Sequence, residues 1–168
     1  MNILEQFQHI RTFVFDIDGV MTDGNLLVTD TGDLLRSMNI RDGYATELAV
    51  KKGYNVWVIS GGKQEAPAIR LRKLGVKETH IAVPDKKQLL LSLFEQYQAA
   101  PEQTLYMGDD IPDYAVMQIC GLATCPNDAA EEIKAVAQYI SPFNGGTGCV
   151  RDVIEKVLKL NGDWDLPQ

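Results

Sequence analysis

Acidic side chains gather in two segments whose pattern is typical of a cation site. The first is D-I-D-G-V-M-T-D-G, which begins at Asp16 and carries Asp18 two positions later. The second is G-D-D-I-P-D, with Asp109, Asp110 and Asp113. Carboxylate oxygens with no His or Cys beside them in the sequence suit Mg²⁺, and crowded carboxylates repel one another unless a cation lies between them. The two segments together predict a magnesium site.

The same residue types can carry phosphoryl transfer. A carboxylate can attack phosphorus and form an aspartyl-phosphate, and the transferred group then needs positive charge and hydrogen-bond donors around its oxygens. Ser60 in S-G-G, Lys86 in D-K-K and the backbone N–H groups near Gly19 and Gly61 are suitable donors. Asp18 is a second acid that can protonate a leaving oxygen and later activate water.

Short apolar runs alternate with longer amphipathic stretches along the chain, and each chemical motif follows a predicted strand. We expect strands at 12–16, 55–60, 80–83, 104–108, 121–125 and 139–140. We expect helices at 43–52 with Asp42 as its cap, at 64–74, from Asp85 to 98, after Pro112, after a cap at Asn127 or Asp128, and at 149–160. Such alternation predicts an α/β fold with a parallel sheet covered on both faces. Ligands bind such sheets beyond the carboxyl ends of the strands.

Residues 1–168 are predicted to form a single domain without a cap domain. Two β-rich pieces around T-D-T-G-D predict a β-hairpin over about 24–38. The interval from Ser60 to Lys86 is too short for a separate domain, and 161–168 is a short tail. An open site of this kind would be covered by a neighbouring subunit, so we expect a homo-oligomer.

The composition narrows the class of partner. The chain has 168 residues, a net charge of −7 and 45% hydrophobic residues. Its acidity argues against nucleic acid and against an anionic membrane surface as partners. No run of 18 apolar residues occurs, and the three cysteines include no C-x-x-C pair. We therefore expect a cytoplasmic protein that acts on a small molecule.

The ordered set of D-x-D-G-V-x-T, S-G, Lys and G-D-D-x-x-D resembles the haloacid dehalogenase superfamily of phosphatases over about 13–158. The resemblance implies a Rossmann-like three-layer α/β/α fold. It implies that Asp16 is the nucleophile and Asp18 the general acid and base, and that Ser60 and Lys86 bind the phosphoryl group. It also implies that Mg²⁺ is held by Asp16, Asp109 and the backbone carbonyl of Asp18, with Asp110 and Asp113 supporting this set.

Further motifs resemble one branch, the 3-deoxy-D-manno-octulosonate 8-phosphate phosphatases of lipopolysaccharide precursor synthesis. These motifs are N-I-R-D-G-Y, the arginine in I-R-L-R-K-L-G, and G-G-T-G-C-V-R-D-V. The resemblance implies a homotetramer whose hairpins pack together and a glycine-rich segment that can reach a neighbouring site. It also implies that the substrate is contacted by Asn39, Arg41, Asp42, Gly43, Gly61 and Arg70.

Two positions depart from that branch and leave alternatives open. Gly62 stands where the octulosonate enzymes usually carry Arg and where phosphatases of nine-carbon keto-acid phosphates carry Glu. Glu47 stands where some octulosonate enzymes carry Arg. The same chemistry on a nine-carbon keto-acid phosphate or another sugar phosphate is therefore an alternative. A non-catalytic oligomerisation module is a further alternative, which the intact set of catalytic residue types disfavours.

Several residues also have a purely structural explanation. Asp113 can be the N-cap of its helix, Ser60 can cap the helix that follows it, and Gly145 with Gly146 can be a flexible turn.

Overall fold

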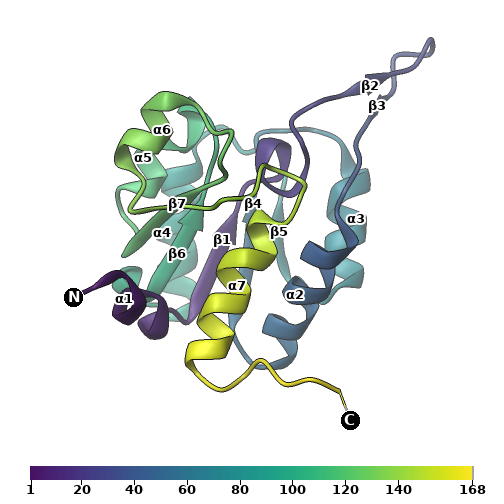
Figure 1. Cartoon of the computed structure of the whole chain (residues 1–168). Helices are drawn as coiled ribbons and strands as arrows, with labels where there is room; N and C mark the ends of the chain where they lie inside the picture. Colours follow the sequence, from purple (N-terminus) through teal and green to yellow (C-terminus); the bar gives the residue numbers. More distant parts are fainter. Residues whose placement is uncertain (168) are drawn as a thin grey trace.

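The computed structural model describes residues 1–167, and its centre is a six-stranded parallel sheet (Figure 1). The strands are β1 (Thr12–Phe15), β4 (Asn55–Ile59), β5 (Glu78–His80), β6 (Thr104–Met107), β7 (Leu122–Cys125) and β8 (Tyr139–Ile140). Their order across the sheet is β5-β4-β1-β6-β7-β8, and every neighbouring pair is parallel. The predicted α/β fold is confirmed.

The central strand β1 shows why the sheet forms. All four residues of T-F-V-F are buried, because strands lie on both sides and helices lie on both faces. Successive side chains point to opposite faces, so Phe13 and Phe15 enter one core and Val14 enters the other. A continuous apolar run is typical of a parallel strand that is buried on both faces.

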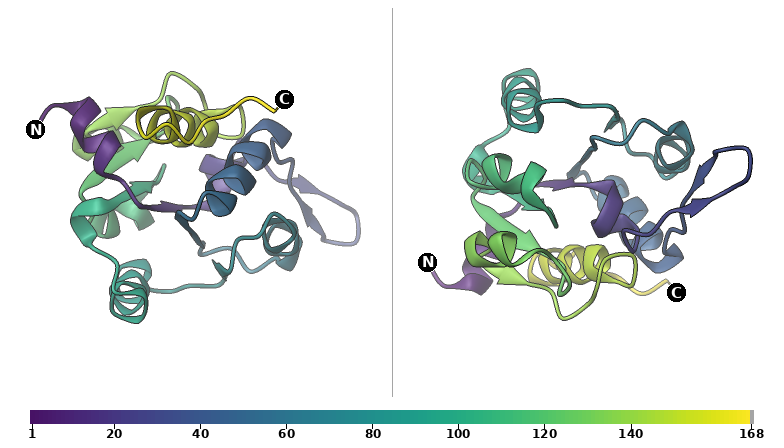
Figure 2. Two further views of the ribbon diagram at one scale, coloured as in Figure 1. Left: turned by 90° about the horizontal axis from the view of Figure 1, so that it is seen from below. Right: turned by 90° about the horizontal axis from the view of Figure 1, so that it is seen from above.

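Helices cover the two faces of the sheet in separate layers (Figure 2). On one face lie α1 (Ile3–His9), α2 (Ile40–Lys51) and α7 (Cys149–Leu160), whose apolar residues share a core with Phe13 and Phe15. On the other lie α4 (Lys86–Tyr97), α5 (Tyr114–Met117) and α6 (Glu131–Val136), which pack around Val14 and Trp57. Helix α3 (Glu65–Lys73) contacts the edge strand β5 and adds Leu71 to the first core.

The predicted hairpin is present and projects away from the sheet (Figure 1). Its strands β2 (Leu27–Val28) and β3 (Leu34–Leu35) pair antiparallel, with Leu27 opposite Leu35. Leu27 is 68% exposed and Val28 is 63% exposed. The hairpin therefore presents apolar side chains that the chain itself does not cover.

The structure corrects three predicted element boundaries. Strand β5 lies at Glu78–His80 rather than at 80–83, because the chain turns at Ala82, which has a φ of 54°. Helix α2 is capped by Asn39 and not by Asp42, since the Asn39 Oδ1 accepts hydrogen bonds from the next free N–H groups. Helix α6 has Ala130 at its N-cap, with no side-chain cap from Asn127 or Asp128.

The α-helix α1 at the start of the chain was not predicted from the sequence. Helix α1 begins after Asn2, which forms a capping box with Glu5 and so satisfies two N–H groups at the helix start. Among the described residues, no helix has the length and apolarity needed to cross a membrane.

Candidate active site

Asp16 follows directly on β1, at the carboxyl end of the sheet. It is only 8% exposed, its Oδ1 accepts a hydrogen bond from the Ile17 N–H at 2.7 Å, and its Oδ2 lies 3.0 Å from Lys86 Nζ. Burial, followed by the charge of Asp113, raises the pKa of Asp16 to about 7, although Lys86 opposes the shift. The carboxyl group is held in one orientation, and its charge is only partly compensated.

Asp109 lies against the loop that follows Asp16. It comes two residues after β6, and a Cβ placed on Gly19 would be 1.8 Å from its Oδ2. Gly19 also has a φ of 85°, a conformation that favours glycine. Burial, followed by the charge of Asp16, raises the pKa of Asp109 to about 8. The absent side chain at position 19 therefore makes room for the second carboxylate.

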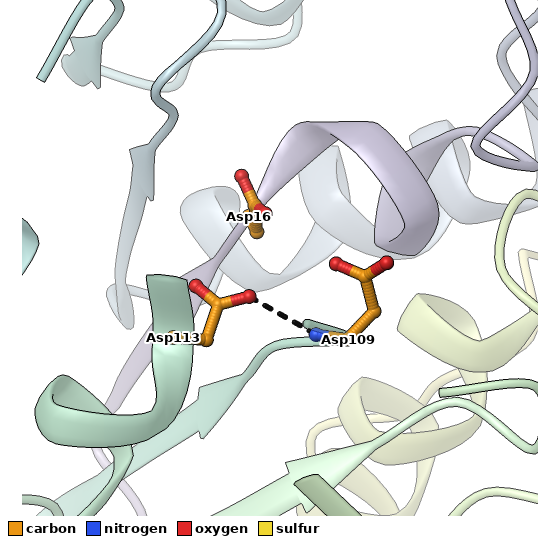
Figure 3. Close-up of side chains that lie close together, drawn as sticks. All are labelled: Asp16, Asp109 and Asp113. Carbon is orange, nitrogen blue, oxygen red and sulfur yellow. Dashed lines mark hydrogen bonds between the residues drawn. The ribbon is translucent and has the colours of Figure 1, made fainter. Parts of the chain in front are cut away.

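Asp113 is the third carboxylate of the group and is fully buried (Figure 3). Its Oδ1 accepts hydrogen bonds from Lys86 Nζ at 2.8 Å and from the Tyr106 hydroxyl at 2.7 Å. Its Oδ2 accepts one from the Asp109 N–H at 3.0 Å. Its side chain does not cap the helix α5, so Asp113 orients Lys86 and Asp109 instead.

Lys86 stands at the first position of α4, where Asp85 caps the helix by accepting from the Gln88 N–H. Its ammonium group is buried between Asp16 and Asp113. Burial alone disfavours this charge, but the two carboxylates outweigh it and raise the pKa of Lys86. The lysine is thus a fixed positive charge beside Asp16.

The group has the composition of a site for a hard cation. Asp16, Asp109 and Asp113 each offer an oxygen atom within 4.8 Å of the others. Burial raises the pKa values of Asp16 and Asp109 first, and the neighbouring carboxylates raise them further, although Lys86 lies beside the group. A set of carboxylate oxygens suits Mg²⁺, so these residues fit a divalent ion. Asp110 does not join them, since it is exposed and its Oδ1 accepts from the Ile111 N–H.

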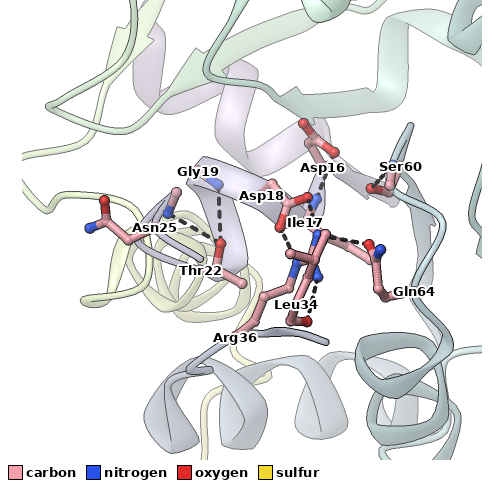
Figure 4. A network of polar contacts seen from close by, with 12 residues as sticks. Asp16, Ile17, Asp18, Gly19, Thr22, Asn25, Leu34, Arg36, Ser60 and Gln64 are labelled. Atoms are coloured by element: carbon pink, nitrogen blue, oxygen red, sulfur yellow. Dashed lines mark hydrogen bonds and ion pairs between the residues drawn. The ribbon is translucent and has the colours of Figure 1, made fainter. Parts of the chain in front are cut away.

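Asp18 faces a different partner from the three clustered acids (Figure 4). Arg36 donates to both of its carboxylate oxygens, from Nε at 2.5 Å and from Nη2 at 3.0 Å. Nη2 also donates to Gln64 Oε1 at 3.1 Å. Arg36 and Gln64 were not predicted as site residues, because no local pattern indicates a contact over 18 or 28 positions of the chain. Tyr106 was not predicted either, since an aromatic residue in a buried strand needs no further explanation.

Ser60 lies at the carboxyl end of β4, and Gly61 and Gly62 follow it. Its buried Oγ accepts a hydrogen bond from the Gly62 N–H at 3.1 Å. A Cβ on Gly62 would be 3.4 Å from this Oγ and 3.2 Å from Asp18 Oδ2. Ser60 and Asp18 therefore both lie next to Gly62, and the exposed Gly61 joins Ser60 to Gly62 in the chain.

The structure does not bring the N-I-R-D segment to the acidic group. Asn39 caps α2, and the buried Asp42 accepts a hydrogen bond from the Arg151 N–H at the start of α7. Burial raises the pKa of Asp42 to about 6. Arg41 is exposed and lines a groove of about 750 Å³ along α7. In this single chain these residues join α2 to α7.

Gly43 and Arg70 form a separate contact. A Cβ on Gly43 would be 2.8 Å from Arg70 Nη2, so the glycine leaves room for the guanidinium group. The two residues line a small pocket with Met21 and Asn39. Arg70 is thus held against α2.

The glycine-rich segment with Gly145 and Gly146 is not a free turn, because it packs against the loop after Asp16. A Cβ on Gly145 would be 2.0 Å from the Gly19 carbonyl oxygen, and the Gly146 N–H donates to the Val20 carbonyl at 2.9 Å.

The start of the C-terminal tail also packs against its own chain. Asp163 accepts from the Tyr54 hydroxyl, and Trp164 packs edge-on against Tyr44.

A parallel sheet of this order, with acids after β1 and β6 and a lysine at the start of α4, defines a phosphatase of the haloacid dehalogenase type. A family model described as haloacid dehalogenase-like hydrolase matches residues 80–154. The 3-deoxy-D-manno-octulosonate 8-phosphate phosphatase of Escherichia coli K12 is 31% identical over 164 residues, which cover 98% of this chain and 87% of that protein. The chain therefore belongs to the family of the 3-deoxy-D-manno-octulosonate 8-phosphate phosphatases, within the haloacid dehalogenase-like hydrolases.

Solved structures agree with this placement. The phosphatase from Yersinia pestis superposes with a TM-score of 0.93 at 30% identity, over 96% of this chain and 87% of that one. The Moraxella catarrhalis phosphatase, solved with a magnesium ion, a phosphate ion and a KDO molecule, gives a TM-score of 0.90 at 27% identity, over 94% and 91% of the two chains.

Proposed function

We propose that this enzyme is a single phosphatase domain over 1–168 that hydrolyses 3-deoxy-D-manno-octulosonate 8-phosphate to the free sugar acid and phosphate in lipopolysaccharide precursor synthesis. The observation that carries the proposal is the buried group of Asp16, Asp109, Asp113 and Lys86 at the carboxyl end of the sheet. The names of the relatives support the choice of substrate. A cytoplasmic location fits a soluble sugar phosphate as substrate.

In the proposed first step, Asp16 attacks phosphorus from the side opposite the sugar oxygen. An oxygen–phosphorus bond forms at Asp16 while the bond from phosphorus to the sugar oxygen breaks. Asp18 gives its proton to that leaving oxygen. In the second step Asp18 takes a proton from water, which attacks phosphorus, releases phosphate and restores the Asp16 carboxylate.

The remaining residues hold the phosphoryl group. Lys86 and Ser60, with the backbone N–H groups near Gly19 and Gly61, would donate to its oxygens and stabilise the charge that spreads over them. Asp16, Asp109 and the backbone carbonyl of Asp18 would hold Mg²⁺. When bound, Mg²⁺ supplies positive charge that offsets the charge of the phosphoryl group.

Asp113 and Asp110 have supporting roles in this proposal. Asp113 keeps Asp109 and Lys86 in place through the three hydrogen bonds that it accepts. Asp110 would act through water, since it is exposed and lies outside the cluster.

The sugar end of the substrate would lie near Gly61 and Gly62. The other proposed substrate contacts, which are Asn39 at the cap of α2, Arg41, Asp42 and Gly43 on α2 and Arg70 on α3, line separate pockets of this chain. Their proposed contact is therefore with the distal sugar or with the surface of a neighbouring subunit. A homotetramer in which hairpins pack together would cover the exposed Leu27 and Val28. It would also close the open side of each site.

A panel of phosphate esters tests the substrate. Phosphate release is measured with Mg²⁺ or with EDTA on the octulosonate 8-phosphate, on a nine-carbon keto-acid 9-phosphate and on glucose 6-phosphate. We expect magnesium-dependent preference for the octulosonate ester. Equal rates on all three would contradict the assigned substrate and keep the chemistry, and Gly62→Arg and Gly62→Glu variants would then locate the specificity. No release by a folded, magnesium-loaded protein would favour the oligomerisation module.

A further inference from the structure

The side chain of Arg36 is buried beside Asp18, although Arg36 belongs to the hairpin segment. Its side chain is 6% exposed, and its Nε and Nη2 each donate to one oxygen of the Asp18 carboxylate (Figure 4). We call this bidentate pair the fork. The rest of the guanidinium group is also held, since Nη1 donates to the Leu34 carbonyl at 3.2 Å and Nη2 to Gln64 Oε1 at 3.1 Å. A buried arginine with this many partners has one fixed orientation.

The missing side chain at position 62 leaves room beside this pair. A Cβ on Gly62 would be 3.2 Å from Asp18 Oδ2 and 3.6 Å from Arg36 Nη2. The positive charge beside Asp18 is thus the guanidinium group of Arg36, which follows β3, and does not come from residue 62.

We propose that Arg36 is a positioning residue that aims the Asp18 carboxyl group at the leaving oxygen. This inference rests on the proposed function, in which Asp18 protonates that oxygen. A carboxylate has four lone-pair directions, and the fork occupies two of them. A further direction remains for the transferred proton, so Arg36 keeps the group in place both before and after proton transfer.

The structure also shows why Asp18 needs such a partner. Asp18 is 37% exposed at its side chain, in contrast to the buried Asp16. A side chain exposed to that extent can rotate into solvent unless another group holds it. Gln64 stands at the N-cap position of α3, but its side chain does not cap the helix. Its Oε1 accepts a hydrogen bond from Arg36 Nη2 instead.

The test compares two leaving groups in the variant Arg36→Met. A sugar alkoxide needs a proton from Asp18, whereas the 2,4-dinitrophenolate of an aryl phosphate leaves without one. The ratio kcat/KM reports only the steps up to transfer of phosphate to Asp16. We expect kcat/KM on the sugar-acid phosphate to fall by about 30-fold or more, and kcat/KM on 2,4-dinitrophenyl phosphate to stay within about threefold of wild type.

Two further variants show that Arg36 acts through Asp18. In the double variant Asp18→Asn/Arg36→Met the loss on the sugar phosphate should equal that of Asp18→Asn alone, because residues that act as one unit are not additive. Arg36→Lys keeps the charge without the fork, so its rate should stay low. Arg72→Gln is the matched control, since Arg72 lies on α3 and pairs with the exposed Glu65, and it should behave as wild type.

Three results would overturn the inference: equal loss on both esters in a folded Arg36→Met protein, an additive loss in the double variant, or full recovery with Arg36→Lys. Circular dichroism and gel filtration establish that each variant is folded. Failure of the proposed function is distinct from these outcomes, because wild-type protein would then release no phosphate from either ester.

Discussion

Gly19 and Asp109 approach so closely that a Cβ on Gly19 would lie 1.8 Å from Asp109 Oδ2. The Asp109 carboxylate can therefore keep this position only if residue 19 lacks a side chain. The contact joins two segments of the proposed catalytic group that are 90 positions apart in the chain (109 − 19).

The variant Gly19→Ala tests this contact. We expect phosphatase activity to fall by at least about 100-fold, because the new methyl group must displace the Asp109 carboxylate. Gly32→Ala is the matched control, since Gly32 has nearly the same φ, 84°, and its Cβ would have no neighbour within 4 Å. Both variants lose about 1 kcal/mol of stability from the positive φ. Equal activity in the two variants would contradict the account.

The hydrogen bond from Tyr106 to Asp113 supplies a second prediction. In Tyr106→Phe the buried Asp113 Oδ1 loses one of its two donors and keeps Lys86. We expect the free energy of unfolding to fall by about 1–2 kcal/mol, with a fall in kcat as Lys86 and Asp109 lose alignment. Urea unfolding and phosphate release measure the two effects. A variant with full stability and full activity would show that this hydroxyl does not help to orient the site.

The raised pKa values of the clustered acids predict how stability depends on pH without metal. Burial raises the pKa of Asp109 from an ordinary value of 3.8 to about 8. The unfolded chain therefore loses this proton at a lower pH than the folded protein does, and the contribution of Asp109 to stability is greatest below pH 3.8 and is lost as the pH rises toward about 8.

The loss of stability with rising pH should be measurable as a change in Tm once metal has been removed. In EDTA we expect the Tm difference between Asp109→Asn and wild type to grow in favour of the variant from pH 5 to pH 8. Mg²⁺ binds the ionised carboxylate, so it should raise the Tm of wild type more at pH 8 than at pH 5. A Tm difference that is independent of pH would contradict the raised pKa.

Asp42 can have a structural role at the start of α7 or contact the substrate, and one variant distinguishes the two. Its Oδ1 accepts a hydrogen bond from the Arg151 N–H at the third position of α7. We expect Asp42→Ala to lower the free energy of unfolding by about 1–2 kcal/mol through loss of this cap, with KM for the sugar-acid phosphate within about twofold of wild type. A large rise in KM with unchanged stability would favour the substrate contact instead.

In the proposed homotetramer, subunits would meet at the exposed apolar residues of the hairpin. Leu27→Asp should reduce the oligomer to smaller species in gel filtration with light scattering, because a charge would be buried between subunits. Leu4→Asp places the same change at an apolar residue on α1 that is 57% exposed, and it should leave the oligomer intact. An unchanged mass for Leu27→Asp would exclude this face from the interface.

The sequence predicted those features that local patterns encode. The strand T-F-V-F, the acids that follow β1 and β6, and Lys86 after Asp85 each carry their own signal, so the fold and the acidic group could be inferred. Arg36 and Gln64 could not, since their partners lie far along the chain and their surroundings look like ordinary polar surface. Tyr106 could not either, because it stands in the apolar strand β6, where an aromatic residue is expected whether or not its hydroxyl has a partner. The cap on α2 could not be predicted either, because N-I-R-D offers two residues that cap helices, Asn39 and Asp42, and only packing selects Asn39.

Attack by Asp16 is the central claim, and one variant tests it most directly. Phosphate release from 3-deoxy-D-manno-octulosonate 8-phosphate is measured in Mg²⁺ for wild type and for Asp16→Asn, with Asp23→Asn as the control from an exposed acid of the same motif. We predict that Asp16→Asn stays folded and loses at least about 1,000-fold in kcat, while Asp23→Asn keeps its rate. A near wild-type rate for Asp16→Asn would contradict the account.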